Sequence, residues 1–537
     1  MAIKRYTATK DNTITNSYKN DLTTRASGSN MGAADILEVF SIYGQQTTSS
    51  AELSRTLIQF PIDTISSDRT AGTLPASGSV SFYLRMFNAR HSEQLPKNFT
   101  FNVLAVSQSW DEGSGLDMEG YTDETNDNMA GSNWINRLTS TKWGKIGGDY
   151  HSSSYTAGAS MPNYTVDFVE GHEDIELDVT AAVEEWLATT QDNYGFGVFL
   201  TSSYEAHTTA SDSNVLHNAT GVQESYYTKR FFSRSSEFFF KKPTIEARWD
   251  STRKDERGEI MYSSSLAGVN DNLNTIYLYN YVRGRLSDIP SIGTNAIYVS
   301  FYSGSDDNSE PSGQAASSSA ATRAAIQLPT TLPHTHVSSI NPYVVTGAHV
   351  STGIYKATFA ITGARAPLTK IFDVWHDGTG KNKPWTGVEY VTASILPTNL
   401  SASQTVAKPV YYINITNLRG QYVTNETARF NLFVRNKDWS PTIYTVANST
   451  VETTTIHSAS YRVFRVIDAL EAVSYGTGSD AHTVLSHYVS GNYFDFDMSL
   501  LDPGYEYAFK FSFYDSAMSS WSEQPELFKF RVIDNEY

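Results

Sequence analysis

The sequence predicts an all-β protein made of several sandwich domains. Aromatic residues make up 13% of the chain, with 33 Tyr and 27 Phe. Strands favour such side chains because they fit a pleated, half-buried surface. Ser, Thr, Asn and Gly fill the gaps between short apolar runs, as expected for many strands joined by turns. A chain of 537 residues is too long for one core, so we expect about three domains.

Residues 1–250 should form the first sandwich. Segments 35–43, 78–87 and 244–249 hold alternating or β-branched runs, and Gly, Ser, Asn or Pro residues bound many of the runs in this unit. Such a pattern is typical of two packed sheets with long connecting loops.

One helix is predicted inside this first unit, over residues 178–187. Asp178 or Thr180 can serve as its N-cap. Val183, Trp186 and Leu187 are spaced i, i+3 and i+4, which places them on one face. Because a lone helix of this length needs tertiary packing to persist, we expect Trp186 to anchor it to the core.

The rest of the chain is predicted to hold a linker and two immunoglobulin- or fibronectin-like sandwiches. Mixed charge followed by small residues indicates a linker at 251–271, with the two sandwiches at 272–397 and 398–537. A long loop is expected at 303–321. In the last unit, the turn Leu501-Asp-Pro-Gly-Tyr-Glu-Tyr507 leads into an alternating strand, an order common before the penultimate strand of immunoglobulin-like sandwiches.

Charge and composition narrow the classes of partner. There are 40 basic and 57 acidic residues, a net charge of −17, which repels phosphate backbones, so we expect no nucleic-acid partner. The absence of cysteine excludes disulfides, cysteine–zinc sites and thiol nucleophiles. No apolar stretch follows the basic opening residues, and none is long enough for a membrane helix. We therefore expect no signal peptide and no membrane insertion.

The order of several short motifs in the first unit resembles the DNRLRE family of disaggregatase-related, carbohydrate-binding-like jelly rolls. The matching positions are Ala8–Ile14, Asn30-Met31-Gly32, Arg55–Phe60, Trp110, Trp134, Asp178-Val179-Thr180, Val183, Trp186 and Asn193-Tyr194-Gly195. The resemblance implies a jelly-roll sandwich with Trp110 and Trp134 in its core. The acidic insertion at 111–132 departs from the family pattern.

The chain as a whole is similar to structural proteins of marine contractile-tailed phages, including those that infect cyanobacteria. The opening MAIKRYTATKDNTIT and the segment SSEFFF at 235–240 carry this resemblance. It implies a virion protein made in the host cytoplasm, whose partners are other virion proteins and further copies of itself. A place in the tail, neck, baseplate, fibre or capsid exterior is left open.

Enzymatic motifs are missing from the sequence. There is no Gly-x-Ser-x-Gly, no His-Glu-x-x-His and no P-loop, and Asp377-Gly-Thr-Gly-Lys381 is interpreted as a turn. We therefore expect a non-enzymatic structural protein with no catalytic residues and no bound cofactor, calcium aside. A glycan-binding adhesin or receptor-binding component and a capsid decoration protein are the alternatives, and a polysaccharide-degrading enzyme is a third hypothesis.

Two segments could bind metal ions. In the acidic insertion, Asp117, Glu119, Asp123 and Asp127 offer the oxygen ligands that calcium needs, although a solvated loop or a glycosidase carboxylate pair would give the same composition. The pair His334-Thr-His336 could bind a transition metal on a strand, or could simply be part of a polar loop.

Aromatic residues supply the candidate contact sites. Trp143, like Trp110 and Trp134, could stack on a sugar ring or pack in the core. The basic and aromatic segment 226–242 contains Arg230, Phe231 and Phe232, which are candidates for contact with a partner. An edge strand guarded by charged residues is the alternative interpretation of that segment.

Overall fold

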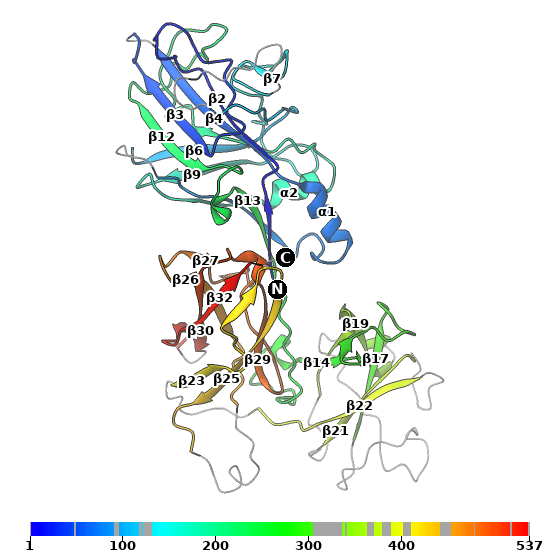
Figure 1. Ribbon diagram of the computed structural model, residues 1–537. Coiled ribbons are helices and arrows are strands. Elements are labelled where there is room, and N and C mark those ends of the chain that lie inside the picture. The colour runs from blue at the N-terminus through cyan, green and yellow to red at the C-terminus, as the bar shows by residue number, and fades with distance from the viewer. Residues whose placement is uncertain are drawn as a thin grey trace.

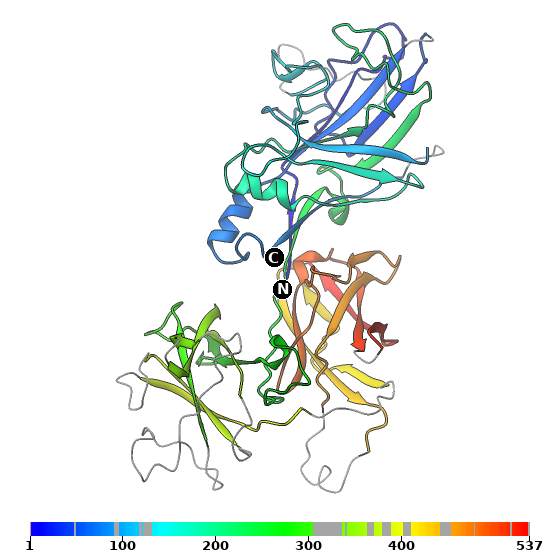
Figure 2. The same ribbon diagram turned by 180° about the vertical axis from the view of Figure 1, so that it is seen from behind.

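The computed structural model describes residues 2–47, 50–90, 96–116, 121, 131–303, 336–338, 341–361, 370–378, 388–400, 410–440, 453–476, 478–515 and 518–534. Strands dominate these residues, with only two α-helices among them, α1 (Ile62–Thr70) and α2 (Thr180–Leu187). The predicted all-β class is therefore confirmed. Figures 1 and 2 show an N-terminal domain above a C-terminal domain, with a middle domain beside the latter.

The N-terminal domain is a jelly-roll sandwich. One sheet has the order β1 (Ile3–Thr7), β13 (Thr244–Arg248), β5 (Ser81–Met86), β10 (Ile175–Asp178). The other has the order β12 (Tyr226–Phe232), β3 (Ile36–Tyr43), β4 (Ala51–Gln59), β11 (Phe196–Leu200), β6 (Phe99–Ala105), β9 (Asn163–Phe168), and β2 (Lys10–Thr15) also pairs with β4. The chain crosses between the sheets from β4 to β5, β5 to β6, β9 to β10 and β10 to β11, which is the jelly-roll path. A hairpin of β7 (Asn136–Leu138) and β8 (Thr141–Lys142) lies outside both sheets.

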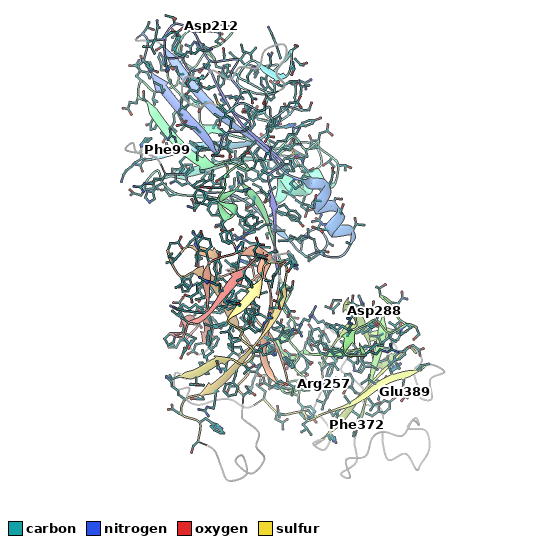
Figure 3. The ribbon with its side chains drawn as sticks, viewed as in Figure 1. Phe99, Asp212, Arg257, Asp288, Phe372 and Glu389 are labelled. Carbon is teal, nitrogen blue, oxygen red and sulfur yellow. The ribbon has the colours of Figure 1, made fainter. Side chains whose placement is uncertain are left out.

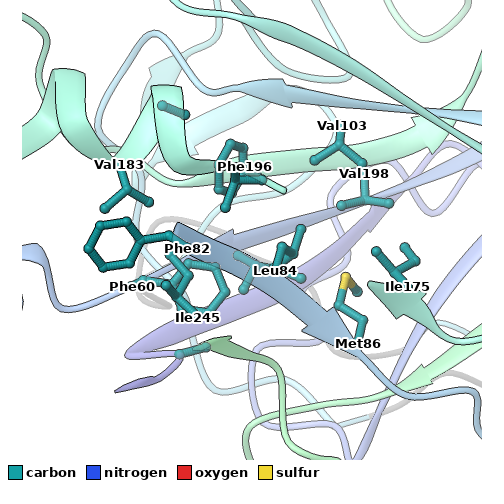
Figure 4. Close-up of a cluster of buried hydrophobic side chains, with 14 of the residues drawn as sticks. Phe60, Phe82, Leu84, Met86, Val103, Ile175, Val183, Phe196, Val198 and Ile245 are labelled. Atoms are coloured by element: carbon teal, nitrogen blue, oxygen red, sulfur yellow. The ribbon is translucent and has the colours of Figure 1, made fainter. Parts of the chain in front are cut away.

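Apolar side chains from both sheets meet in a single core. Figure 4 shows Phe82 and Leu84 of β5 facing Phe196 and Val198 of β11 across this layer. Every second residue of β5 is buried, as strand geometry requires when one face covers a core.

The predicted helix is present as α2, and Trp186 anchors it. The Trp186 side chain is buried, and its ring centroid lies 4.9 Å from that of Phe196. The N-cap position is Val179, which has no capping side chain. The Asp178 carboxylate accepts the Thr180 N–H at 2.9 Å, and the Thr180 hydroxyl accepts the N–H of Phe82. The helix start is thus held to β5.

Helix α1 was not predicted. Only Ile62 and Ile65 of its nine residues are buried, so its sequence carries almost no amphipathic pattern. Its last turn is held instead by ionic contacts, because Arg69 forms two hydrogen bonds with the Glu184 carboxylate of α2, at 2.7 and 2.9 Å.

The middle domain is one curved sheet whose two halves share a strand. Its order is β14 (Asn274–Tyr279), β20 (Ile354–Phe359), β19 (Asn341–Ser351), β17 (Ile297–Ser303), β21 (Ile371–His376), β22 (Glu389–Ile395), with β18 (His336–Ser338) pairing β19 and a separate hairpin of β15 (Tyr281–Val282) and β16 (Arg285–Leu286). Strand β19 pairs with β17 through residues 344–347 and with β20 through 348–351. The bend encloses a core around Trp375 and Phe301.

The segment predicted as a linker is packed rather than free. Ile260 and Tyr262 are buried in the core of the middle domain, and Met261 bridges to Thr398. Most of the predicted loop at 303–321 lies outside the described residues, as do His334 and Lys381.

The C-terminal domain has the strand order of an immunoglobulin-like sandwich. One sheet is β23 (Tyr411–Ile415), β25 (Thr427–Asn436), β29 (Gly491–Asp497), β28 (Ser486–Tyr488). The other is β24 (Gln421–Val423), β32 (Phe528–Ile533), β30 (Glu506–Asp515), β26 (Ala459–Arg465), β27 (Glu471–Val473), with β31 (Ser520–Glu523) pairing β30. Three single-turn 3-10 helices, η1 (Phe239–Lys241), η2 (Asn270–Asn272) and η3 (Met498–Leu500), complete the described elements.

The turn predicted before the penultimate strand is a tyrosine corner. Tyr507 begins the buried part of β30, and its hydroxyl donates to the carbonyl oxygen of Asp502 at 3.1 Å. This arrangement is a hallmark of immunoglobulin-like sandwiches.

Replacing Tyr507 with Phe should destabilise the C-terminal domain by about 1 kcal/mol, because the part-buried hydrogen bond to the Asp502 carbonyl is lost. Hydrogen exchange of the β30 amides in dilute urea measures this change. Tyr505→Phe, at a side chain that is 40% exposed, is the control and should have almost no effect. Equal exchange in the two variants would contradict the role of the corner.

Candidate functional site

The predicted calcium ligands cannot be placed. Asp117, Glu119, Asp123 and Asp127 all lie outside the described residues. Beside them, Glu112 is described, and it forms an ion pair with Arg234 at 2.5 Å. The described parts of the chain contain no group of three or more His, Cys, Asp or Glu side chains that could hold a metal ion.

Three of the tryptophans of the N-terminal domain, those considered above as sugar contacts, are core residues. Trp110, Trp134 and Trp143 are 1%, 0% and 5% exposed. Each indole N–H donates at 2.9 Å to a backbone carbonyl, those of Tyr194, Asn214 and Asn133. The predicted contact of Trp143 with carbohydrate or a partner is therefore wrong, because its ring face is covered by the same apolar cluster that holds the other two.

The other predicted contact residues lie in strand β12, where successive side chains point to opposite faces. Phe231 is fully buried in the jelly-roll core, so the prediction that it contacts a partner is also wrong. Arg230 is part-exposed, but its Nε donates to Glu38 at 2.9 Å. Burial raises the pKa of Glu38, and the Arg230 guanidinium opposes that rise. Arg230 therefore has a clear structural role in compensating a buried carboxylate.

Lys229 is a residue that we did not single out from the sequence. It is 1% exposed, and its Nζ donates to Asn88 Oδ1 and to the carbonyl oxygens of Gly171 and Glu173. Burial lowers its pKa to about 8. The period-two alternation that places Phe231 inward also places Lys229 inward, and a lysine on a core face was the signal that could have identified it.

An aromatic patch remains exposed next to β12. We define it as Phe232, Phe238, Phe239 and Lys241. Phe238 and Phe239 are 50% and 53% exposed, and the Phe232 and Phe238 ring centroids lie 5.3 Å apart. Lys241 Nζ lies 4.9 Å from the Phe232 ring centroid. Of the predicted contact residues, Phe232 alone belongs to this patch.

Phe240 turns away from the patch and toward the C-terminal domain. It is 9% exposed, its ring lies 6.4 Å from that of Tyr507, and it belongs to the core cluster of the C-terminal domain. Ile3 of β1 belongs to the same cluster. The outer face of the β1–β13–β5 sheet is thus the contact surface between the two domains.

A buried carboxylate lies at the centre of that contact surface. The strand register places Arg5 of β1 opposite Glu246 of β13, and their Nε and Oε2 atoms are 2.7 Å apart. Arg248 Nε donates to Glu246 Oε1, also at 2.7 Å, and Arg85 lies 3.8 Å away. Burial alone would raise the pKa of Glu246, but the guanidinium groups of Arg5, Arg85 and Arg248 together hold it well below its ordinary value.

Two of these arginines also bind the C-terminal domain. Arg5 donates to the carbonyl oxygens of Ala472, at 2.6 Å, and Leu500, at 3.2 Å. Arg248 lies 3.4 Å from the Asp480 carboxylate. One connected set of charges therefore joins domains that are separated in the sequence by the middle domain.

The segment after β13 joins the middle and C-terminal domains. Asp255 N–H donates to the His487 carbonyl, and His487 N–H donates to the Arg253 carbonyl, both at 3.0 Å. Figure 3 shows Arg257 between the two domains, where its guanidinium forms two hydrogen bonds to the buried Asp373 carboxylate of β21. The C-terminal domain is thus the centre to which both other domains attach.

A groove of about 440 Å³ lies between α1, α2 and residues 155–158. Its charged groups already have partners, since Glu184 pairs with Arg69. Hydrogen bonds from Thr190 and Gly158 lower the pKa of Glu185. A glycosidase acid needs a raised pKa, so this groove does not offer one at Glu185.

Comparison with known proteins gives only distant structural similarity. No protein-family model matches the chain, and no curated protein matches it. Among solved structures, it is similar to the fibronectin(III)-like modules of Clostridium thermocellum CbhA, with 13% identity, a TM-score of 0.14, and coverage of 53% of this chain and 93% of that one. It is also similar to the titin domains z1z2 in complex with telethonin, with 12% identity, a TM-score of 0.13, and coverage of 52% and 92%. Overall similarity this low supports no functional argument.

Helices give no sign of a membrane span. Within the described residues, neither α-helix is long and apolar enough to cross a bilayer.

Replacing Glu246 with Gln should destabilise the protein by about 3–5 kcal/mol, because it leaves the surrounding arginines without their buried counter-charge. Glu176→Gln is the matched control. Its carboxylate also pairs with Arg85 and Arg248, but it is 42% exposed, so the cost should be below about 1 kcal/mol. Urea midpoints measure both changes, and equal losses would contradict a central role for Glu246.

The lowered pKa of Glu246 predicts that the stability of the folded protein decreases at acid pH. Because the folded protein holds the pKa of Glu246 below the ordinary value of 4.5, the unfolded chain binds this proton first as pH falls. The stability that Glu246 contributes should be complete above that ordinary value and decline below it. Urea midpoints across this range should fall for the wild type and fall less for Glu246→Gln.

Proposed function

We propose that this chain is a non-enzymatic structural protein of a tailed-phage virion. The observation that carries the proposal is the buried charge network, because it fastens the first domain to the last. A stiff multidomain unit suits a protein whose task is to hold a position in an assembly.

The sequence supplies the support for a phage origin. The opening MAIKRYTATKDNTIT and the segment at 235–240 are similar to structural proteins of contractile-tailed phages. The DNRLRE-like order of motifs is compatible with the observed jelly roll. We infer a protein made in the host cytoplasm and carried in the particle, in the tail, neck, baseplate, a fibre or as a capsid decoration.

Exposed aromatic side chains are the proposed contact surfaces with other virion proteins or further copies of the chain. The aromatic patch of the N-terminal domain is one, with two phenylalanines about half exposed. Aromatic residues are enriched at protein interfaces, where a few such side chains supply most of the binding energy.

A glycan-binding adhesin is the second candidate, and one observation favours it. Trp521 of β31 is 51% exposed, and its ring lies 5.5 Å from that of Tyr514, which is 38% exposed. Two neighbouring exposed rings can stack on a sugar. Because Trp110, Trp134 and Trp143 of the jelly roll are buried, this function would reside in the C-terminal domain.

Mass spectrometry of purified particles tests the first proposal. Particles of the phage that encodes this chain, purified on a density gradient, should contain it at a fixed ratio to the major capsid protein. Its absence from particles, with the chain present in the infected-cell lysate, would contradict a structural role.

A glycan array separates the two candidates. The structural proposal predicts no binding above background for the wild type. The adhesin predicts binding that Trp521→Ala abolishes and Phe238→Ala, at an equally exposed ring in another domain, leaves intact. Binding with that pattern would replace the first proposal for the C-terminal domain.

A further inference from the structure

Lys229 occupies a place that is unusual for a lysine. Its Nζ lies 4.8 Å from the Phe168 ring centroid and 5.2 Å from that of Phe231, inside the end of the jelly-roll core. Lysine is almost never fully buried unless a partner holds it. One of its three acceptors is a side-chain carboxamide, that of Asn88, at 2.8 Å.

The backbone holds Asn88 and Lys229 together. Asn88 follows β5 of one sheet, and Lys229 lies in β12 of the other. Ala89 N–H donates to Arg230 O at 2.9 Å, and Phe232 N–H donates to Phe87 O at 3.1 Å. Asn88 also bridges to Phe231, and its own N–H donates to Asp174 Oδ1. The amine and the carboxamide are therefore fixed in contact rather than brought together by chance.

We propose that Lys229 and Asn88 form an intramolecular isopeptide bond. The lone pair of the neutral Lys229 Nζ attacks Cγ of Asn88, and a new C–N bond forms. The bond from Cγ to Nδ2 then breaks, and Nδ2 leaves as ammonia after it takes up one proton that Nζ has lost. The products are a secondary amide and one ammonia, and the reaction needs no oxidant or other reactant.

The surroundings favour the neutral amine that this step requires. Burial lowers the Lys229 pKa to about 8, which makes the neutral amine easier to reach than at an exposed lysine. The carbonyl oxygen of Glu173 lies 2.6 Å from Nζ. Once the new bond has formed, Nζ and Nδ2 are attached to the same Cγ, so the proton that Nζ loses passes to Nδ2 within this group.

The bond would tie the two sheets of the jelly roll covalently. The chain has no cysteine, so no disulfide can do this. A cross-link between residues so far apart in the sequence closes a long loop. It lowers the conformational entropy of the unfolded chain, as a disulfide does.

Mass spectrometry of the denatured full chain tests this proposal directly. After incubation above the Lys229 pKa, the wild type should be lighter than its sequence mass by one ammonia. Tryptic digestion should release a branched peptide that contains both Lys229 and Asn88. Lys229→Arg and Asn88→Ala should each have their full sequence mass, whereas Lys241→Arg, a control in the same segment, should still lose one ammonia.

A wild-type chain at its full sequence mass, with Lys229 in a linear peptide, would overturn the proposal. Loss of ammonia that persists in Lys229→Arg would overturn it too, because that ammonia would come from another site. The wild-type measurement decides the matter even if a variant fails to fold.

Discussion

The structure depends on a carboxylate that is buried among arginines. Taking a charge such as that of Glu246 out of water costs several kcal/mol, and the cost is offset only where opposite charges are held at short range. Arg5 and Arg248 provide this compensation on the outer face of the jelly roll, and the same two side chains then bind backbone and carboxylate oxygens of the C-terminal domain. The two arginines that compensate Glu246 in the jelly roll therefore also hold the C-terminal domain in place.

Apolar contacts and the interdomain segment complete this arrangement. Ile3 and Phe240 extend from the jelly roll into the C-terminal core. On the opposite side, the backbone around Asp255 hydrogen-bonds to His487, and Arg257 reaches Asp373 in the middle domain. The C-terminal sandwich therefore joins the other two, and Figure 1 shows both ends of the chain close to its contact with the jelly roll. This stack of three domains is the unit that we propose to be part of a larger particle.

The sequence was informative where local pattern decides the structure. Alternating apolar residues predicted the sandwiches, the spacing around Trp186 predicted α2, and the sequence Leu501–Tyr507 predicted the turn that leads into β30. The charge network around Glu246 could not be predicted from the sequence, because its members are distant in the chain. Arg5 and Glu246 are 241 residues apart. Trp143 and Phe231 were candidates for contact with a sugar or a partner, but residue type alone does not say which side chains face the core.

Distance measurement between the first and last domains tests the central claim most directly. The chain has no cysteine, so Thr141→Cys and Ser520→Cys, at exposed positions in β8 and β31, would carry the only two spin labels. If the buried charge network makes one stiff unit, pulsed electron paramagnetic resonance should give a distance distribution with a single narrow peak. The peak should broaden in Glu246→Gln. A broad distribution in the wild type would show that the two domains move independently, and would contradict the account.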